Sequence, residues 1–535
     1  MTADPAPWWR QGIVYQVYPR SFADANGDGT GDIKGIQSKL PYLRDLGVDA
    51  IWINPWYASP LNDGGYDVED YRRIDPRFGD VEAAEQFIAA AHEHGIRIIA
   101  DFVPNHTSSE HVWFQAALAA GPGSPERERY WFHPGKGPDG DEPPNNWQAV
   151  FGGSAWERLP DGDWYLHLFD ATQPDLNWNH PDVAAETLDV FRFWLDRGVD
   201  GFRIDVAHGL VKDPALPDIE GDGVQILSNS KQPNHPHWDR DAVHPINKTW
   251  RALLDQYDDR MMVAEAWVSV ESLPKYLEPD EYHQSFNFDF LSCEWDAEQM
   301  RTTAARSIDA AASVGSTTTW VLSNHDVVRH PTRYGLPKGT NWRAWLLDGP
   351  HEILDADLGR RRARAAALLV LSLPGSVYMY MGDELGLPEV YDLPTEVLDD
   401  PVWEMSGHTS KGRDGCRVPM PWSTDGPSFG FGDAAPWLPQ PALYGELSAG
   451  AQTGDPESSL ELHRAAIALR RELLGDDETI TWLDLGADVI AFDRPGLRCV
   501  VNFGDPVPMP DGEVLLASGP VGAELPGDTA VWLAV

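Results

Sequence analysis

The stretch Gly201–His208 (GFRIDVAH) is the segment from which the fold is best worked out. It is an apolar, strand-like run that ends in charge, and Arg203 and Asp205 lie two residues apart, so they share one face of an extended strand. Three other segments repeat this arrangement: Asp101–His106 (DFVPNH), Val263–Trp267 (VAEAW) and Val321–Asp326 (VLSNHD). Charged and hydrogen-bonding clusters at successive strand ends predict one site assembled from several parallel strands.

Eight apolar runs bounded by polar or turn residues predict the strands of a barrel. They are Ile13–Phe22, Val48–Pro55, Arg97–His106, Gly201–His208, Met261–Trp267, Gln284–Leu291, Thr317–Asp326 and Ser376–Leu385. Amphipathic, helix-like stretches such as Val81–His94 and Val183–Arg197 lie between them. This alternation predicts an α/β fold, a parallel (β/α)₈ or TIM barrel, whose active site lies where the carboxyl ends of the strands meet the following loops.

Two connections are too long to be simple turns. Residues 107–172 are rich in Gly and Pro and form an insertion after the third strand, and Leu210–Pro245 is a polar loop expected at the rim of the pocket. Ser459–Leu473 is the expected last barrel helix, and from Asp476 short alternating pieces predict a small antiparallel β domain. The predicted domains are a barrel of residues 1–106 and 173–475, an insertion of 107–172 and a C-terminal β domain of 476–535.

Composition excludes several classes of protein. The 84 acidic and 41 basic residues give a net charge of −43, which repels phosphate backbones, so no nucleic-acid partner is expected. A solvated acidic surface or adaptation to salt would both account for this charge. The longest apolar runs, such as Ala365–Leu373, are too short to span a membrane. The N-terminus lacks a basic region followed by an apolar one, and three cysteines imply no disulfide framework, so a cytoplasmic protein is expected.

The strand-end segments together resemble the α-amylase family of glycoside hydrolases (family 13), from about Trp8 to the C-terminus. Gln173–Asn177 (QPDLN) resembles the signature of its α-glucosidase and oligo-1,6-glucosidase branch. Asn62–Tyr71 (NDGGYDVEDY) and Arg413–Trp422 (RDGCRVPMPW) resemble the loops that close the pocket for the non-reducing-end glucose in that branch. The resemblance implies a retaining, exo-acting α-glucosidase on short α-glucosides, with residues 107–172 as the family's B domain.

Two acidic residues are the expected catalytic pair. The resemblance implies Asp205 as the nucleophile that forms a covalent glucosyl-enzyme and Glu265 as the general acid/base. A guanidinium at Arg203 should hold the Asp205 carboxylate ionised. The apolar neighbours of Glu265 should favour its protonated form through desolvation.

Further residues are expected to bind the sugar. The resemblance implies that Asp326, as a third catalytic carboxylate, and His325 hold the hydroxyls of the distorted glucose, where hydrogen bonds strengthen in the transition state. His106 should contact the same sugar. Asp101 is expected to orient the turn that carries His106.

A lid is expected over the non-reducing end of the substrate. An ion pair between Asp67 and Arg413 would stop longer chains from passing through, and Tyr66 would offer a stacking face. Arg417 competes with Arg413 for this role.

Asp24–Asp32 (DANGDGTGD) spaces oxygen ligands at alternate positions around glycines. The side chains of Asp24, Asn26, Asp28 and Asp32 with the Thr30 carbonyl could bind Ca²⁺ or Mg²⁺. The twelfth position is Gly35 rather than Glu, so an EF-hand is not expected. The resemblance implies a structural ion here and no cofactor for chemistry, and an Asp/Gly-rich turn without metal is the alternative.

The linkage and the reaction remain open at this stage. Val206 follows the expected nucleophile, and in the branch that this chain resembles a Val at this position accompanies α-1,6 cleavage. The sequence around Val206, however, resembles that of enzymes that act on maltose. A glucosyltransferase or isomerase forming trehalose or isomaltulose is the close alternative. A catalytically silent barrel that acts as an interaction protein is a remote one, since it predicts lost carboxylates. A monomer and a homo-oligomer are not distinguished.

Overall fold

The computed structural model describes residues 6–220 and 235–535. Eight parallel strands form a nearly closed barrel in which neighbours in space follow one another in sequence, and the eighth pairs with the first. They are β1 (Ile13–Val17), β2 (Ala50–Ile53), β5 (Arg97–Phe102), β9 (Gly201–Ile204), β10 (Met261–Ala264), β11 (Gln284–Ser285), β12 (Thr319–Val321) and β13 (Ser376–Tyr380). Between β11 and β12 the Thr319 hydroxyl donates to the Ser285 carbonyl at 3.0 Å. The predicted TIM barrel is confirmed.

The strands are shorter than the apolar runs that predicted them. The run Ile13–Phe22 divides into β1 and the short helix α1 (Pro19–Phe22), because Pro19 favours the first position of a helix. The run Gln284–Leu291 divides into β11 and α9 (Phe288–Leu291), whose first turn is capped when the Asn287 side chain accepts from Phe290 N. Each predicted run therefore contains a strand and the start of the loop that carries the site.

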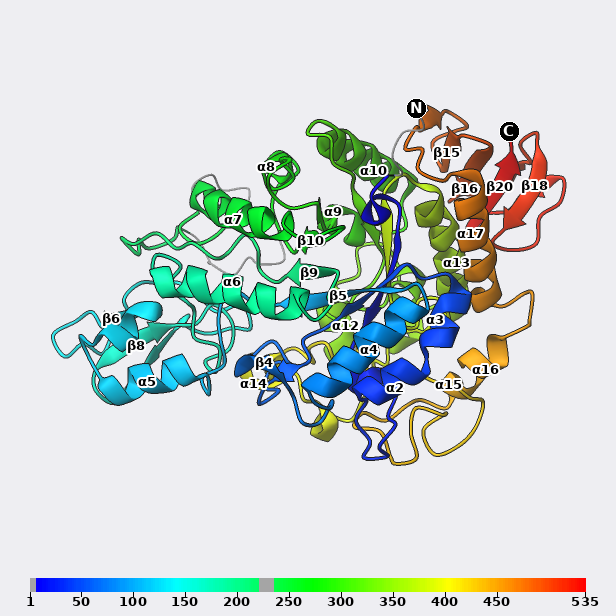
Figure 1. Ribbon diagram of the computed structural model, residues 1–535. Coiled ribbons are helices and arrows are strands. Elements are labelled where there is room, and N and C mark those ends of the chain that lie inside the picture. The colour runs from blue at the N-terminus through cyan, green and yellow to red at the C-terminus, as the bar shows by residue number, and fades with distance from the viewer. Residues whose placement is uncertain (1–5, 221–234) are drawn as a thin grey trace.

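Helices cover the outside of the barrel (Figure 1). The longer ones are α4 (Val81–Glu93), α6 (Pro181–Leu195), α7 (His244–Leu254), α10 (Ala297–Ala312), α13 (Ala356–Ser372) and α17 (Ser459–Leu473), with α2 (Ile33–Ser38) and α3 (Leu40–Leu46) after β1. Side chains of Asp80, Asp296, Asp355 and Ser458 cap four of these helices at their N-termini. Each cap satisfies a backbone amide that the helix leaves without a partner.

A small α/β unit interrupts the barrel after β5. It contains α5 (Val112–Ala120) and an antiparallel sheet of β6 (Phe132–Pro134), β8 (Asp163–Leu166) and β7 (Trp156–Arg158), and it projects to the left in Figure 1. Its tryptophans Trp147 and Trp156 pack in one apolar cluster with Val206 and Trp238. The insertion and the loop after β9 therefore share a core. The expected rim loop 210–245 lies partly outside the described residues.

The C-terminal residues form an antiparallel sheet on the side of the barrel away from the insertion (Figure 1). Its strand order is β14 (Thr481–Leu483), β15 (Val489–Arg494), β16 (Leu497–Asn502), β20 (Thr529–Ala534) and β18 (Glu513–Ala517), beside a pair β17 (Val507–Pro508) and β19 (Glu524–Leu525). The sheet packs on α13, where Trp532 Nε1 donates to the Leu368 carbonyl at 3.1 Å. The expected C-terminal β domain is confirmed as part of the fold.

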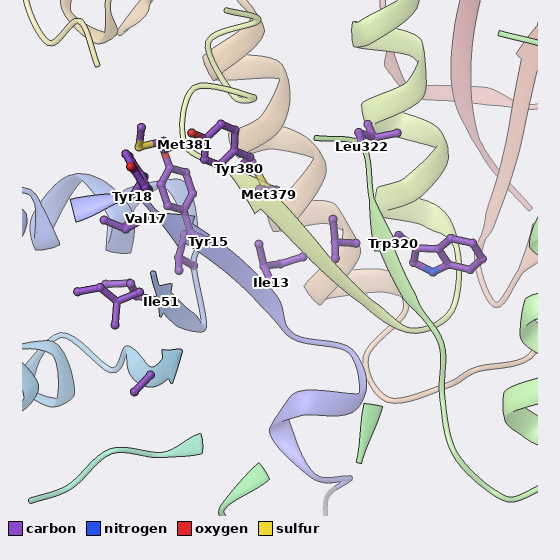
Figure 2. Close-up of a cluster of buried hydrophobic side chains, with 14 of the residues drawn as sticks. Ile13, Tyr15, Val17, Tyr18, Ile51, Trp320, Leu322, Met379, Tyr380 and Met381 are labelled. Atoms are coloured by element: carbon purple, nitrogen blue, oxygen red, sulfur yellow. The ribbon is translucent and has the colours of Figure 1, made fainter. Parts of the chain in front are cut away.

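The main core lies between the barrel strands and the helices around them. Figure 2 shows side chains of β1 and β13 with Trp320 of β12 in this layer, and all are buried. The cysteines Cys293, Cys416 and Cys499 are buried and unpaired. No helix among residues 6–220 and 235–535 has the length and apolar character that crossing a membrane requires.

Candidate active site

A buried arginine joins three strand ends. Nη1 of Arg203, in β9, lies 2.9 Å from Asp101 Oδ1 and 2.6 Å from Asp205 Oδ1, and its Nη2 lies 2.6 Å from Glu265 Oε2. These carboxylates come from β5 and from the first residues after β9 and β10. The structure therefore brings Asp205 and Glu265 together at the carboxyl end of the barrel, and it adds Asp101 as a direct partner of the same guanidinium.

Burial dominates the electrostatics of this cluster. Desolvation raises the pKa of Asp205 well above its usual range, Arg203 opposes the rise, and the negative charges of Glu265 and Asp101 add to it. Burial likewise raises the pKa of Asp101 to about 6 against the pull of Arg203. Arg203 is thus placed to favour the ionised form of Asp205, as expected, while burial and the two neighbouring carboxylates oppose it.

Glu265 lies in a more polar setting than its sequence neighbours suggest. Its Oε2 accepts from Arg203 Nη2 and from the Val206 amide at 3.1 Å, and its Oε1 accepts from Trp267 Nε1 at 3.1 Å. The indole of Trp267 stacks on Phe288, with ring centroids 3.8 Å apart. The carboxylate of Glu265 is thus not in the apolar environment predicted from its flanking residues. Residues that are neighbours along the chain do not all face this carboxylate.

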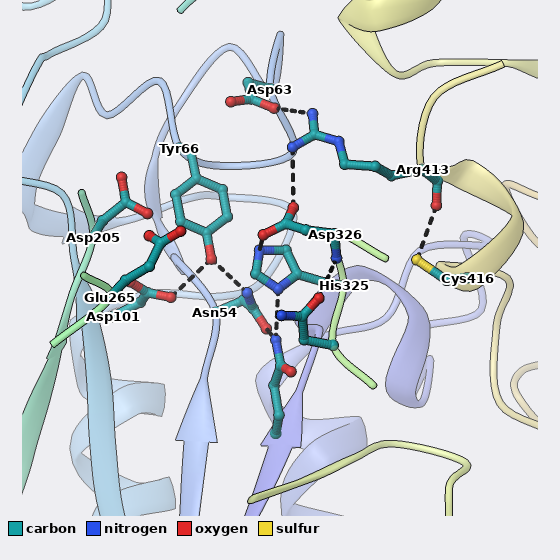
Figure 3. Close-up of polar contacts among 12 residues, drawn as sticks. Asn54, Asp63, Tyr66, Asp101, Asp205, Glu265, His325, Asp326, Arg413 and Cys416 are labelled. Atoms are coloured by element: carbon teal, nitrogen blue, oxygen red, sulfur yellow. Dashed lines mark hydrogen bonds and ion pairs between the residues drawn. The ribbon is translucent and has the colours of Figure 1, made fainter. Parts of the chain in front are cut away.

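A second charged cluster stands across the site (Figure 3). Asp326 Oδ1 lies 3.1 Å from Arg413 Nη1 and 3.3 Å from Arg417 Nη2, and its Oδ2 lies 3.3 Å from His325 Nε2. Burial pushes the pKa of Asp326 up, but the His325 ring and the two guanidiniums outweigh it and hold the pKa far below the usual range. Asp326 is therefore an ionised acceptor at neutral pH.

The predicted ion pair between Asp67 and Arg413 is wrong. Arg413 Nη2 pairs with Asp63 at 2.6 Å, whereas Asp67 is completely buried and accepts from the Ser59 hydroxyl at 2.8 Å and from the Asn62 amide at 2.9 Å. Burial raises the pKa of Asp67 to about 6.

The two glycines between Asp63 and Asp67 explain why Asp63, and not Asp67, pairs with Arg413. Gly64 and Gly65 both have positive φ, 58° and 109°, which glycine adopts without strain. The resulting turn directs Asp63 towards Arg413 and Asp67 inward. The spacing of residues in NDGGYD is compatible with either aspartate, so it could not decide between them.

Both candidate arginines reach the site. Arg413 also binds Asp400, with Nε 2.6 Å from Oδ2, and Arg417 Nε donates to the His325 carbonyl at 2.9 Å. Arg413 and Arg417 therefore both contact Asp326, and Arg413 is the one that also pairs with Asp63. Sequence analysis missed Asp400, because no local motif marks it.

Tyr66 and His106 form the wall between the two clusters. The Tyr66 hydroxyl donates to Asp101 Oδ2 at 2.9 Å, and its ring stacks on His325 with centroids 5.2 Å apart. His106 Nε2 lies 3.1 Å from the Tyr66 carbonyl and 3.2 Å from Gln173 Nε2, and burial lowers its pKa to about 4. One face of Tyr66 is therefore covered by protein, and His106 is a neutral ring.

Three amide side chains connect these groups; none was predicted as a site residue, although Gln173 belongs to the quoted QPDLN segment. Gln16 Nε2 donates to Asn54 Oδ1 at 2.9 Å and lies 2.7 Å from His325 Nδ1, and Asn54 Nδ2 donates to the Tyr66 hydroxyl at 2.7 Å. Gln173, in the QPDLN segment, donates to Asp63 Oδ2 at 3.0 Å. Their positions at strand and loop ends were the available signal.

In the loop expected to bind a metal, the side-chain oxygens accept hydrogen bonds from backbone amides of the same segment. Asp24 accepts from Gly27 and Gly29 amides, and Asp32 accepts from Ala25, Asn26 and Gly35 amides, while the side chains of Asn26 and Asp28 each accept from the amide two residues later. Among the residues that the structure describes, no three His, Cys, Asp or Glu side chains are grouped so that they could hold a metal ion. The predicted ligand set also includes Asn26 and the Thr30 carbonyl, which are outside that grouping, so the ion at Asp24, Asn26, Asp28, Thr30 and Asp32 stays a prediction.

Comparison with known proteins agrees with this geometry. The family model for the catalytic domain of alpha-amylase matches residues 16–476, and a domain of unknown function matches residues 475–532. The chain is 38% identical over 478 residues to a protein named "Probable alpha-glucosidase" from Rhizobium meliloti strain 1021, covering 87% of this chain and 82% of that protein. It is 35% identical over 501 residues to an oligo-1,6-glucosidase from Parageobacillus thermoglucosidasius, covering 87% and 84%.

Solved structures of enzymes named for other reactions share the whole fold. An α-glucosyl transfer enzyme, XgtA, superposes with a TM-score of 0.85 at 35% identity over 99% of each chain. The trehalulose synthase of Pseudomonas mesoacidophila MX-45 superposes with a TM-score of 0.85 at 30% identity over 99% of this chain and 100% of that one. The chain belongs to the α-amylase family of glycoside hydrolases, family 13.

Proposed function

We propose that this enzyme is a retaining, exo-acting α-glucosidase that releases glucose from the non-reducing end of short α-glucosides such as maltose and malto- or isomalto-oligosaccharides. The observation that carries the proposal is the Arg203 cluster, which holds Asp205 and Glu265 on one guanidinium at distances of 2.6 Å each. A retaining mechanism needs two neighbouring carboxyl groups, about 5–5.5 Å apart, one as nucleophile and one as proton donor, and the shared guanidinium keeps Asp205 and Glu265 side by side.

In the proposed reaction Asp205 attacks the anomeric carbon while Glu265 gives a proton to the departing oxygen. The bond from the anomeric carbon to the leaving oxygen breaks, and an ester between glucose and Asp205 forms. Glu265, now ionised, takes a proton from water, which attacks the anomeric carbon and releases glucose with the original configuration. Arg203 lies beside both groups and stabilises the negative charge, which is on Asp205 before the ester forms and on Glu265 afterwards.

Asp326 and His325 would hold sugar hydroxyls opposite this pair. Asp326 is ionised and fixed by two arginines, so it can accept hydroxyl hydrogens without rearranging. The ion pair between Asp63 and Arg413 would close the pocket beyond the terminal glucose. That closure is the reason for proposing exo-action rather than cleavage inside a chain.

Covalent trapping tests the nucleophile. A glucosyl fluoride with a second fluorine on the ring forms the ester quickly and loses it slowly, because the ring fluorine disfavours the positively charged transition state of the second step. Mass spectrometry of the digested protein should place the adduct on the peptide that contains Asp205, and Asp205→Asn should give none. An adduct on another residue would reassign the nucleophile.

A product time course tests the reaction class. Maltose and isomaltose should yield free glucose, and Asp205→Asn should lower the rate by at least about a thousandfold. The shared fold of the glucosyl transfer enzyme and the trehalulose synthase supports a second candidate, in which a sugar hydroxyl rather than water attacks the ester. Conversion of sucrose or maltose to an isomer with little free glucose would establish that candidate.

Val206 is the proposed contributor to linkage preference, because it follows Asp205 and is buried. One methyl-scale change there is worth only about 1–3 kcal/mol, so Val206→Ala should shift the ratio of maltose to isomaltose hydrolysis without abolishing either. Use of imported sugars in the cytoplasm is part of the same proposal, and the free, buried cysteines fit a reducing compartment.

A further inference from the structure

The turn that follows the proposed nucleophile holds a strained residue. Val206 has φ 46°, in the left-handed region, which a β-branched residue such as valine rarely adopts. Such a conformation costs on the order of 1–3 kcal/mol and persists only where the surroundings enforce it. The turn Val206–Lys212 is buried along most of its length.

The strained backbone is directed at Glu265. The Val206 amide lies 3.1 Å from Glu265 Oε2, and the next amide, that of Ala207, donates to the Glu265 carbonyl at 2.9 Å. The turn therefore binds both the side chain and the main chain of the same residue. An extended conformation at Val206 would turn the Ala207 amide away from the Glu265 carbonyl.

An indole presses on the outer side of this turn. A Cβ placed on Gly209 would lie 2.4 Å from Trp238 Cζ3 and 2.7 Å from Val206 Cγ1, so no larger residue fits there without a shift. Trp238 is buried and belongs to the apolar cluster that includes Trp147 of the insertion. The turn cannot move outward while this packing holds.

A buried ammonium group holds the inner side. Lys212 has no exposed surface, and its Nζ donates to the Gly209 carbonyl at 2.9 Å and to Asn105 Oδ1 at 2.6 Å. It also pairs with the equally buried Asp175 at 2.6 Å. Lys212 thus links the turn to Asn105, the neighbour of His106, and to the QPDLN segment.

We propose that the turn Val206–Lys212 is a positioning element for the proton donor: its backbone amides hold Glu265, and Lys212 and Trp238 hold the turn. This inference rests on the role proposed above for Glu265. If the ion pair between Lys212 and Asp175 were merely structural, its removal would lower stability and would reduce activity on every substrate alike. A positioning role would affect most the substrates that need a proton on the leaving group.

The test compares leaving groups. Lys212→Met combined with Asp175→Asn removes the pair without leaving a lone buried charge, and the variant is assayed on maltose and on para-nitrophenyl α-glucoside. The nitrophenolate departs with little protonation, whereas the glucose of maltose needs it. We expect kcat/KM on maltose to fall at least about tenfold more than on the aryl glucoside, because proton donation contributes strongly to such departures. Glu265→Gln calibrates the size of this difference.

Gly209→Ala is the second variant, and it remains informative if the charge-balanced double variant does not fold. Its methyl group should push the turn and give the same dependence on the leaving group. Gly519→Ala is the matched control, since a Cβ at Gly519 meets nothing within 4 Å. Equal losses on both substrates, or no loss, would overturn the inference. If Glu265→Gln itself shows no difference between the substrates, the proposed role of Glu265 falls, and this inference falls with it.

Discussion

Asp63 forms one short ion pair with Arg413, whose guanidinium also binds Asp326 and Asp400. Arg417 reaches Asp326 as well. Two arginines and three carboxylates thus form a nearly balanced network in a buried place, where hydrogen bonds between charged groups contribute more than at the surface. In the proposed function, this network is the feature that would limit entry to the non-reducing end of a sugar chain.

Asp63→Asn should weaken the closure while keeping a side chain of the same size. Loss of a charge-assisted hydrogen bond costs about 1.5–3 kcal/mol, so kcat/KM on maltose should fall roughly tenfold to a hundredfold. Products from longer malto-oligosaccharides should also become more varied. Steady-state kinetics and chromatography of the products measure both effects.

The matched control is Asp280→Asn, which removes an exposed pair with Lys248 and should change nothing. An unchanged kcat/KM in Asp63→Asn, with glucose still the sole product from long chains, would show that Asp63 does not close the pocket.

At the scale of elements, the loop of residues 24–32 shows how a sequence pattern can have two structural outcomes. Asp32 accepts from the Gly35 amide at 2.7 Å as the N-cap of α2 and from the Ala25 amide at 3.0 Å. The loop is thereby ordered by its own hydrogen bonds. Alternating oxygen ligands and self-capping turns use the same residues, since Asp and Asn favour both.

We propose that Ca²⁺ nevertheless binds this loop after a local shift of its side chains. Excess Ca²⁺ should then raise the Tm, by an amount corresponding to about 2.7 kcal/mol at a hundred times Kd, and a chelator should lower it. Asp28→Ala should remove the response. Differential scanning fluorimetry with Ca²⁺ and Mg²⁺ measures it.

Because the chain carries a net charge of −43, a divalent cation can also stabilise it by screening alone. Asp141→Ala, at an exposed position in the insertion, removes the same charge elsewhere and should keep the response. If both variants respond to Ca²⁺ like the wild type, the loop does not bind the ion.

The whole molecule keeps many histidines neutral by burial. Burial lowers the pKa to about 4 for His106, His111, His208, His235 and His463. The unfolded chain takes up a proton on each near pH 6.5, but the folded protein does not until about pH 4. Stability should therefore fall as the pH falls through this window. Burial raises the pKa of carboxyls such as Asp383 and Glu389 to about 7. Their contribution to stability therefore increases as the pH falls, opposite to that of the histidines.

His463→Gln isolates one of these contributions away from the site. His463 lies on α17 and its Nδ1 is 2.8 Å from the Ser459 carbonyl. Between pH 6.5 and 4 the wild type should lose up to about 3 kcal/mol that the variant keeps, so the Tm of the variant should decline less. Thermal melts across this range measure the effect. The exposed His133 provides the control, and Tm curves that stay parallel for wild type and His463→Gln would contradict the prediction.

The sequence by itself determined the barrel, the order of its strands and the C-terminal β domain, because apolar periodicity and turn residues act over short distances along the chain. It also placed Asp205, Glu265 and Asp326 at strand ends. The tertiary structure alone decided which groups meet: Asp63 pairs with Arg413 across 350 residues, and Asp101 joins Arg203. These outcomes depend on loop conformation and desolvation, which arise only when distant segments pack together.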